Sequence, residues 1–173
     1  SKKESDYLLY EEPMGTVSGV QTQIPVLLSE YQFQSKEDVD AYLELMKTTP
    51  DYFNSLIAFE QEKAQKGLFM ASYTADTVIE QCQAFIDMGD SNYLISTFVD
   101  RIQKLTDLSE SEKSDYIQKN AYMLKTYVLP AYQQLIKTVV ELKDSGKNEE
   151  GLCYLPNGKE YYELTVQAST GSV

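Results

Sequence analysis

The chain of 173 residues contains no histidine, no tryptophan and only one arginine, Arg101. Histidine is the usual general base near neutral pH and the commonest metal ligand. Its absence excludes serine–histidine and cysteine–histidine nucleophile systems as well as zinc sites of the HExxH kind. Two cysteines are also too few for an all-cysteine zinc site. We therefore expect this chain to carry no complete catalytic site by itself.

Positive charge is scarce too. Fifteen lysine and arginine residues stand against twenty-seven acidic ones, which gives a formal net charge of −12. Such a field repels phosphate backbones and anionic lipid surfaces, so nucleic acid and membrane-surface partners are disfavoured. Because arginine is the residue that grips phosphate with two parallel hydrogen bonds, a nucleotide clamp built from an arginine cluster is excluded.

Long apolar runs are missing, since no stretch approaches the ~20 residues that span a bilayer. The chain begins at Ser1 with neither a methionine nor a signal peptide, so any export signal would already be missing. Cys82 and Cys153 have no metal-ligand spacing, and the sequence does not place them within bridging distance. Their redox state and the compartment stay open at this point.

Apolar and aromatic residues are plentiful. Hydrophobic residues make up 42% of the chain, which indicates one folded domain with a sizeable core. The aromatic residues are fourteen tyrosines and six phenylalanines. Tyrosine has an apolar ring and a polar tip, so it suits half-buried helix faces and groove walls. Packing between helices is the commoner of these uses.

Residues 1–34 differ from the rest of the chain. The segment Glu11–Gly15 is typical of a turn, and Thr16–Ile24 contains a further glycine and precedes Pro25. This pattern predicts an extended, partly strand-like lead-in, followed by a short helix near Val26–Tyr31. We take residues 35–173 as a helical domain that forms one structural unit with this lead-in.

Helix signals dominate from Ser35 onward. A serine followed three residues later by an acid is typical of a helix start, and Thr49-Pro50-Asp51 predicts a second start with proline in the first turn. This second helix is expected to close at Gly67. Two further helices are predicted, one from about Thr74 to Gly89 and one from about Ser91.

The longest helical pattern begins at the capping box Ser109–Glu112 and keeps apolar spacings of three and four to about Asp144. Pro130 interrupts it, because the ring collides with the carbonyl four residues earlier. Since the apolar phase survives the proline, we expect one kinked helix rather than two. Gly146 is expected to end it.

A loop and a final helix from about Lys159 to Ala168 complete the predicted elements. No run of strands is apparent, so the predicted class is all-α: an irregular multi-helix array with one long proline-kinked helix and an extended N-terminal lead-in. No repeat of fixed period is present.

Carboxylate chemistry remains open, because two acids can hydrolyse glycosides and oxygen ligands alone can bind calcium. Asp87, Asp90 and Asn92 surround Gly89, but the alternating ligand spacing of a calcium loop is missing. We interpret this stretch as a glycine-terminated helix followed by a turn.

Three further positions have a functional and a structural interpretation. Cys82 lies within an apolar stripe, which favours a buried small hydrophobe over a nucleophile. Glu60 shares a helix face with Phe53 and Ile57, so it is either a buried acid of functional interest or, more often, an acid at the edge of the stripe with its carboxylate in water. A polar-aromatic cluster near the C-terminus could line a cleft, with first-turn packing as the alternative; its members are Asn157, Lys159, Tyr161 and Tyr162.

Several segments together resemble a bacterial family catalogued as domain of unknown function 885. Residues 19–28 with Tyr31 and Phe33 are similar to its "GVQ..LP.LL..Y.F" segment, and residues 128–132 to its "VLPAY" within a long helix. Residues 151–162 are similar to its "GL..LP.G..YY" motif. Further similarities are Tyr42-Leu43, Pro50-Asp51-Tyr52 and Gly67. The order and spacing of these motifs carry the resemblance, from about residue 10 to the C-terminus.

Members of that family resemble HExxH zinc metallopeptidases, many of them exported or lipid-anchored, with the histidines downstream of the last motif. The resemblance implies a non-catalytic helical scaffold segment of a longer zinc-dependent peptidase-like protein, and extracytoplasmic or lipoprotein-anchored localisation. Zinc is implied only for the longer protein, and no catalytic or zinc-binding residue is assigned in this chain. The implied partners are the remainder of that protein, or a second copy through exposed apolar helix faces, and a peptide.

Two rival hypotheses remain. The chain could be a stand-alone helical module that binds peptides or glycans through tyrosine-rich faces, or a carboxylate enzyme.

Overall fold

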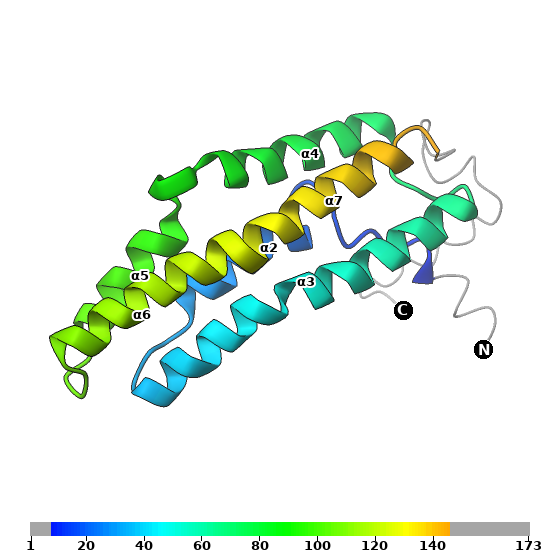
Figure 1. Cartoon of the computed structure of the whole chain (residues 1–173). Helices are drawn as coiled ribbons and strands as arrows, with labels where there is room; N and C mark the ends of the chain where they lie inside the picture. The colour runs from blue at the N-terminus through cyan, green and yellow to red at the C-terminus, as the bar shows by residue number, and fades with distance from the viewer. Residues whose placement is uncertain (1–7, 146–173) are drawn as a thin grey trace, which may run out of the picture.

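A computed structural model describes residues 8–145, and every regular element among them is helical (Figure 1). The all-α class predicted from the sequence is therefore confirmed. Counting the joined elements at the C-terminal end as one, the described part has five helices. They are α2 (Val20–Glu30), α3 (Lys36–Gln65), α4 (Ser72–Asp87), α5 (Tyr93–Gln103), and the joined helix of α6 (Glu110–Met123), a π-helical segment (Leu124–Val128) and α7 (Leu129–Leu142).

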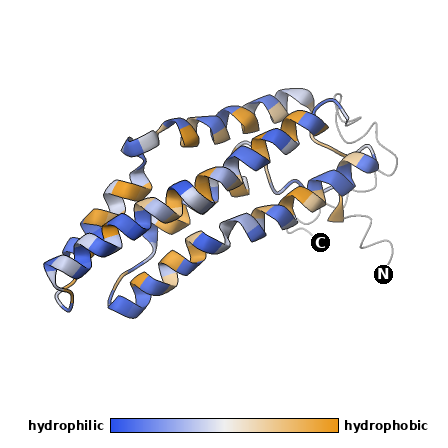
Figure 2. Cartoon of the chain, in the orientation of Figure 1, coloured by the Kyte–Doolittle hydropathy of each residue, from blue (hydrophilic) through white to orange (hydrophobic). Residues whose placement is uncertain are grey.

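The two longest helices organise the fold. In Figure 1, α3 and the joined α6–α7 helix lie side by side and run in the same direction, while α4 runs back along α7. Helix α5 packs on α6, and α2 contacts both α4 and α5. Hydrophobic residues recur along each helix (Figure 2), and those facing neighbouring helices form one continuous core.

Helix α2 begins earlier than the sequence pattern predicts, because residues 20–24 are helical rather than extended. Tertiary contacts outweigh the local helix breakers. The amide of Val20 donates to the carbonyl of Pro13 at 2.8 Å, which orients the first turn. Pro25 lies inside the helix and cannot donate to the carbonyl of Gln21. The hydroxyl of Tyr132 donates to that carbonyl at 2.7 Å instead.

Helix α3 is one helix of 30 residues, so the predicted break at residues 49–51 was wrong. Pro50 stays inside it because the buried face continues on both sides, through Met46 and Phe53. Ser35 is the N-cap residue, but its side chain makes no capping bond. The predicted end at Gly67 is confirmed, with φ at 72°. The amide of Gly67 donates to the carbonyl of Ala64, and the amide of Leu68 donates to the carbonyl of Lys63. These two hydrogen bonds form a Schellman motif at the end of the helix.

The long C-terminal helix and its capping box are confirmed. The Glu112 amide donates to Ser109 Oγ and the Ser109 amide to Glu112 Oε1, both at 3.1 Å. Ahead of Pro130 the helix widens, and the amide of Leu129 donates to the carbonyl of Leu124, five residues back. A π-helical turn of this kind lets a helix continue past an insertion or a proline without losing its axis.

This joined helix ends at Leu142, slightly before the predicted boundary at Asp144. Gly146, expected to end it, and the predicted final helix near residues 159–168 lie outside the described residues. Met14, in the lead-in, and Leu28 pack into the same core as the later helices. None of the helices between residues 8 and 145 is both long and apolar enough to cross a bilayer.

Candidate functional site

The structure tests only some of the residues singled out from the sequence. Asn157, Lys159, Tyr161 and Tyr162, expected to line a cleft, lie outside the described residues and stay predictions. Cys153 also lies outside them, so its pairing with Cys82 is untested.

Cys82 is buried, as predicted. Its side chain is 1% exposed within the core, and burial raises the pKa of its thiol to about 12. A thiol held in its neutral form is a poor nucleophile. The structural interpretation is therefore confirmed.

The stretch around Gly89 is a helix end and a turn, again as predicted. Gly89 has φ at 52°, and the side chain of Asn92 caps α5 by accepting from the amide of Leu94 at 2.9 Å. Asn92 Nδ2 donates to the carbonyl of Phe85 at 3.4 Å, so its side chain is committed to the fold.

Glu60 contradicts the commoner interpretation, which placed its carboxylate in water. The side chain is fully buried, and no donor group in the described part of the chain makes a hydrogen bond to either oxygen of its carboxylate. Burying an uncharged polar group without a hydrogen bond costs on the order of 2–7 kcal/mol, and burying an ionised carboxylate in this way costs more. The fold must therefore neutralise it.

Two charged neighbours surround Glu60. Lys63, one helical turn further along α3, is 2% exposed. Its Nζ donates to the carbonyl of Glu11 and lies 3.3 Å from Glu12 Oε2. The other oxygen of Glu12 accepts from the amide of Met14 at 3.1 Å. The lead-in is thus fixed to α3 by a buried lysine and two carboxyl groups, here called the Glu12–Glu60–Lys63 cluster.

Burial, followed by the nearby negative charge of Glu12 and a hydrogen bond with its side chain, raises the pKa of Glu60 to about 9, against a smaller opposing effect of Lys63. Glu60 consequently holds a proton at neutral pH. Glu12 Oε2 also has no hydrogen-bond partner. One proton on Glu60, donated to this oxygen, satisfies both groups at once.

A sequence signal for this cluster existed. Glu60 and Lys63 continue the buried stripe of Phe53, Leu56 and Ile57 at helical spacing, so both were candidates for burial on one face. What the sequence did not reveal is the third member, Glu12, which comes from the lead-in 48 positions before Glu60 in the numbering.

A pocket of about 440 Å³ lies beside the cluster, between the lead-in and α3. Among the described residues that line it, most are apolar, and the charged ones are Glu11 and Glu12. The other lining residues are Leu8, Pro13, Tyr52, Ser55, Leu56 and Phe59.

A second pocket, of about 270 Å³, lies between α2 and α3 and shares Tyr52 with the first. Ile24, Leu27 and Leu45 contribute to its walls. Because Leu27, Leu45 and Tyr52 are each about half exposed, the two pockets form one apolar surface across α2 and α3. We call it the α2–α3 apolar surface. A third pocket, about 310 Å³ and more polar, has Glu12 and Lys63 among its lining residues.

Arg101 has a structural role. Its Nη1 donates to the carbonyls of Leu28 at 3.0 Å and Tyr31 at 2.7 Å, at the end of α2. The guanidinium lies 4.4 Å from the ring centre of Phe33 and 4.9 Å from that of Tyr42. Its planar fork and aromatic stacking explain an arginine at this position in a chain that otherwise uses lysine.

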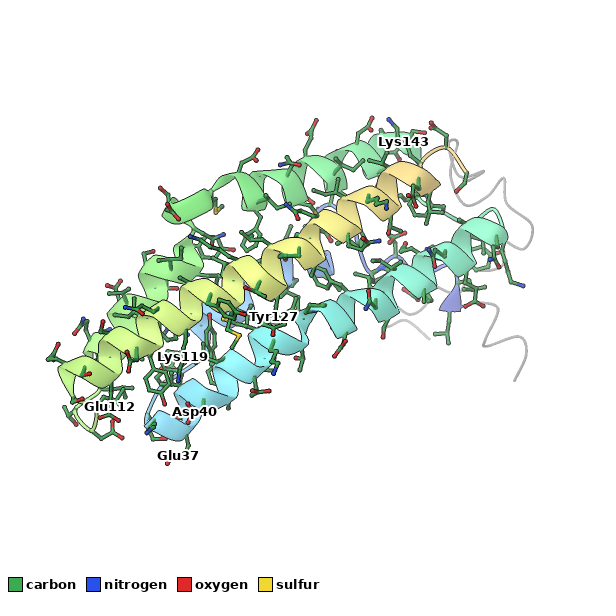
Figure 3. All side chains as sticks on the ribbon, in the orientation of Figure 1. Glu37, Asp40, Glu112, Lys119, Tyr127 and Lys143 are labelled. Carbon is green, nitrogen blue, oxygen red and sulfur yellow. The ribbon has the colours of Figure 1, made fainter. Side chains whose placement is uncertain are left out.

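Acidic residues gather where α3 and α6 begin. Figure 3 shows Glu37 and Asp40 of α3 beside Glu112 and Lys119 of α6. Asp40 accepts a hydrogen bond of 2.7 Å from the hydroxyl of Tyr116, and burial together with this carboxylate raises the pKa of Tyr116. This hydrogen bond and an ion pair between Lys36 Nζ and Glu112 Oε2 at 3.5 Å join the two helix starts.

No group of three or more acidic or cysteine side chains that could hold a metal occurs among residues 8–145. With no histidine in the whole chain, the donor set does not fit a catalytic zinc ion of the HExxH kind. The described part offers apolar pockets and a buried acid pair beside Lys63.

Comparison with protein families places the chain. Residues 2–173 match the model of DUF885, described as a bacterial protein of unknown function. The chain belongs to this family. The resemblance drawn from its sequence motifs is thereby confirmed. Two motifs meet in the DUF885 fold, since the Tyr132 hydroxyl of "VLPAY" bonds the Gln21 carbonyl of "GVQ".

A solved structure, the putative lipoprotein from Colwellia psychrerythraea, superposes with a TM-score of 0.84 at 18% identity. The match covers 89% of this chain but only 27% of the other, so this DUF885 chain spans about a quarter of the length of that protein. At this identity the likeness shows a shared fold. A search of curated proteins finds no match.

Proposed function

We propose that this DUF885 chain is a non-catalytic helical scaffold segment of a longer, zinc-dependent peptidase-like bacterial protein, and that its α2–α3 apolar surface forms one wall of a peptide-binding cleft. The observation that carries the proposal is that surface: two adjoining apolar pockets that share Tyr52. Its fold matches 27% of a longer protein, and an apolar surface of this kind is suited to contact with further protein.

The chemistry of the longer protein lies outside the described residues. Zinc would be supplied and held there, since the donor set between residues 8 and 145 does not fit it. An extracytoplasmic or lipid-anchored location is part of the same proposal, supported by the description of the related solved protein as a putative lipoprotein.

The absence of tryptophan provides a sharp test. Tyr52→Trp places a single fluorescent reporter where the two pockets join, and Tyr122→Trp places one at a similarly exposed site on α6, away from both. Apolar peptides should shift the emission of the first variant to shorter wavelength and leave the second unchanged. Saturable binding without hydrolysis is expected.

Two results would overturn the proposal. One is stoichiometric zinc in the native mass spectrum of the 173-residue chain together with peptide hydrolysis, which would make the segment catalytic by itself. The other is an identical response of both reporters, which would place peptide binding outside the α2–α3 apolar surface. Tight binding of a peptide to this chain, without competition from any other part of the longer protein, would favour the rival hypothesis of a stand-alone binding module.

A further inference from the structure

Each helical layer of the described bundle contains an interruption. Pro25 lies inside α2 and Pro50 inside α3, and each lacks the amide that would bond the carbonyl four residues earlier. Helix α4 passes into α5 through the turn at Gly89–Ser91. The joined α6–α7 helix contains the π-helical segment Leu124–Val128, shortly before Pro130. A helix bends most easily at interruptions of this kind.

Tyr132 places three of these interruptions at one level along the bundle. This residue lies in the first turn of α7, directly after the π-helical segment. Its hydroxyl donates at 2.7 Å to the carbonyl of Gln21, which Pro25 leaves without a backbone donor. Its ring centre lies 4.9 Å from that of Phe53, in the turn after Pro50. The breaks in α2, α3 and the joined helix therefore adjoin one another.

The turn between α4 and α5 lies at the same level. The ring centre of Phe85, in the last turn of α4, is 4.6 Å from that of Tyr132. Asp90 in the turn lies 3.3 Å from the ammonium group of Lys125 in the π-helical segment. Both of these side chains are largely exposed, so water screens the ion pair and it restrains the level only weakly. On either side of the level, α4 packs along α7 and α5 along α6 (Figure 1).

The second pocket lies across this level, between the two helices that contain an internal proline. Its lining includes the residue directly before each proline, Ile24 in α2 and Thr49 in α3. The hydroxyls of Thr48 and Thr49 donate to the carbonyl of Leu45 at 2.9 and 3.2 Å. Hydroxyl bonds of this kind to the preceding turn bend helices. A change in the bend of α2 or α3 therefore changes the distance between the walls of the pocket.

We infer that this level is a hinge. The half of the bundle built by α5, α6 and the first part of α3 turns relative to the half built by α4, α7 and the rest of α3. Hinges use a few positions at breaks in regular structure, while the packed parts on either side move as units. The enclosed Tyr132 ring is the pivot, because it contacts α2, α3 and α4 at once. The turning itself goes beyond the proposed function, and its coupling to a peptide in the second pocket rests on that function.

Distances between pairs of spin labels on the full chain test the hinge. One pair, Glu80→Cys with Asp100→Cys, places exposed labels on α4 and α5, one in each half. A second pair, Glu80→Cys with Glu62→Cys, places both labels in the half that contains α4 and α7. Cys153→Ser removes one native thiol, and Cys82 stays unlabelled because it is buried. The distance distribution of the first pair should be at least two-fold broader, and equal widths would overturn the hinge.

A variant in α3 separates a hinge of the whole bundle from a loose turn between α4 and α5. Pro50→Ala restores an amide donor to the carbonyl of Met46, so it should narrow the first distribution and leave the second unchanged. Asn54→Ala, exposed one turn further along α3, is the control and should change neither. Equal narrowing in both variants, or none in either, would overturn the assignment of the hinge to this level. The comparison of the two label pairs stands even if Pro50→Ala destabilises the chain.

An apolar peptide should shift the first distribution toward one of its extremes, because a filled second pocket fixes the distance between α2 and α3. The emission of an unlabelled Tyr52→Trp chain reports peptide binding separately. Binding that leaves the distances unchanged would overturn the coupling and leave the peptide cleft standing. If no peptide binds, the proposed function and the coupling both fail, while the label distances still decide the hinge.

Discussion

Glu60 and Lys63 lie one turn apart on the buried face of α3, where helical proteins ordinarily place apolar residues. Their burial is tolerated because the charges are shared: a proton stays on Glu60, and Lys63 meets Glu12 and a backbone carbonyl. The cluster thus joins the lead-in to α3 through polar interactions in place of apolar contact. These interactions form only when the lead-in lies in one position along α3. Buried polar groups of this kind specify an arrangement more than they stabilise it.

The proton on Glu60 makes the stability of the protein depend on pH. In the folded protein the pKa of this carboxyl is raised from its ordinary 4.5 to about 9. Between these values the folded state binds one more proton than the unfolded chain, so the free energy of unfolding falls as the pH rises. The contribution is fully present below the ordinary pKa and is lost through about pH 9.

Glu60→Gln should remove this dependence, because an amide stays neutral and can donate to Glu12 Oε2 as the protonated acid does. At pH 8 the variant should be more stable than the parent by about 1–3 kcal/mol, and the gain should vanish near pH 4. Urea unfolding at several pH values measures it. Glu62→Gln, exposed on the same helix, is the matched control. A gain that is the same at all pH values would contradict the proton-sharing account.

The residue types that carry this cluster could be read from the sequence, but their pairing could not. Glu60 was recognised as lying on the buried face; its burial is confirmed, and a functional role for it stays a prediction. The choice between them depended on Glu12, which reaches the site only through the path of the lead-in. A contact between segments so distant in the chain has no local signature. Cys82, whose surroundings are local and apolar, was interpreted correctly.

Helix boundaries show the same division at the scale of elements. Ends set by local geometry were predicted, such as the glycine cap at Gly67 and the capping box at Ser109. Prolines were overestimated as breakers at Pro25 and Pro50, both of which lie inside helices. At the first, a hydroxyl from a distant helix replaces the missing donor. Packing against other helices therefore stabilises a helical conformation that the local sequence disfavours.

The start of α2 depends on a close approach that only glycine allows. A Cβ atom at Gly19 would lie 2.2 Å from the carbonyl oxygen of Gly15 and 2.4 Å from the side-chain oxygen of Gln21. Gln21 is itself committed, because its Nε2 donates to the Gly15 carbonyl at 3.0 Å and to Gln81 at 2.8 Å. Gly19 therefore lets the lead-in fold back onto α2 and α4.

Gly19→Ala should destabilise the chain by about 2–4 kcal/mol, in the range of overpacked core substitutions with a disrupted hydrogen bond. Gly15→Ala is the matched control, since its Cβ would meet nothing closer than 3.9 Å. It should change the free energy of unfolding by less than about 1 kcal/mol. Thermal and urea unfolding of the two variants measure the difference, and equal losses would refute a steric role for Gly19.

At the scale of the whole molecule, the core and the α2–α3 apolar surface differ in how completely their apolar side chains are covered. The core is closed, with Tyr42, Phe53 and Tyr132 fully enclosed between helices. The surface across α2 and α3 keeps large apolar side chains about half exposed, at positions that hydropathy alone does not separate from core positions. The sequence predicted that such faces would exist, and the packing of α2 against α5 and α4 decided where.

An apolar surface of this kind should bind apolar dyes and promote association as long as nothing covers it. Leu27→Ser with Leu45→Ser removes two exposed side chains from the second pocket without opening the core, because these residues are 59% and 46% exposed. We expect dye fluorescence and any concentration-dependent association to fall at least two-fold, with little change in thermal stability. Val140→Ser on α7, with 54% exposure and no place in either pocket, is the control for the loss of an exposed apolar side chain elsewhere. If the control lowers both readouts equally, apolar exposure in general is responsible and the α2–α3 apolar surface has no special part. If only the double variant lowers them, the same substitutions should also weaken binding of apolar peptides to the Tyr52→Trp chain, because both readouts then report on one surface.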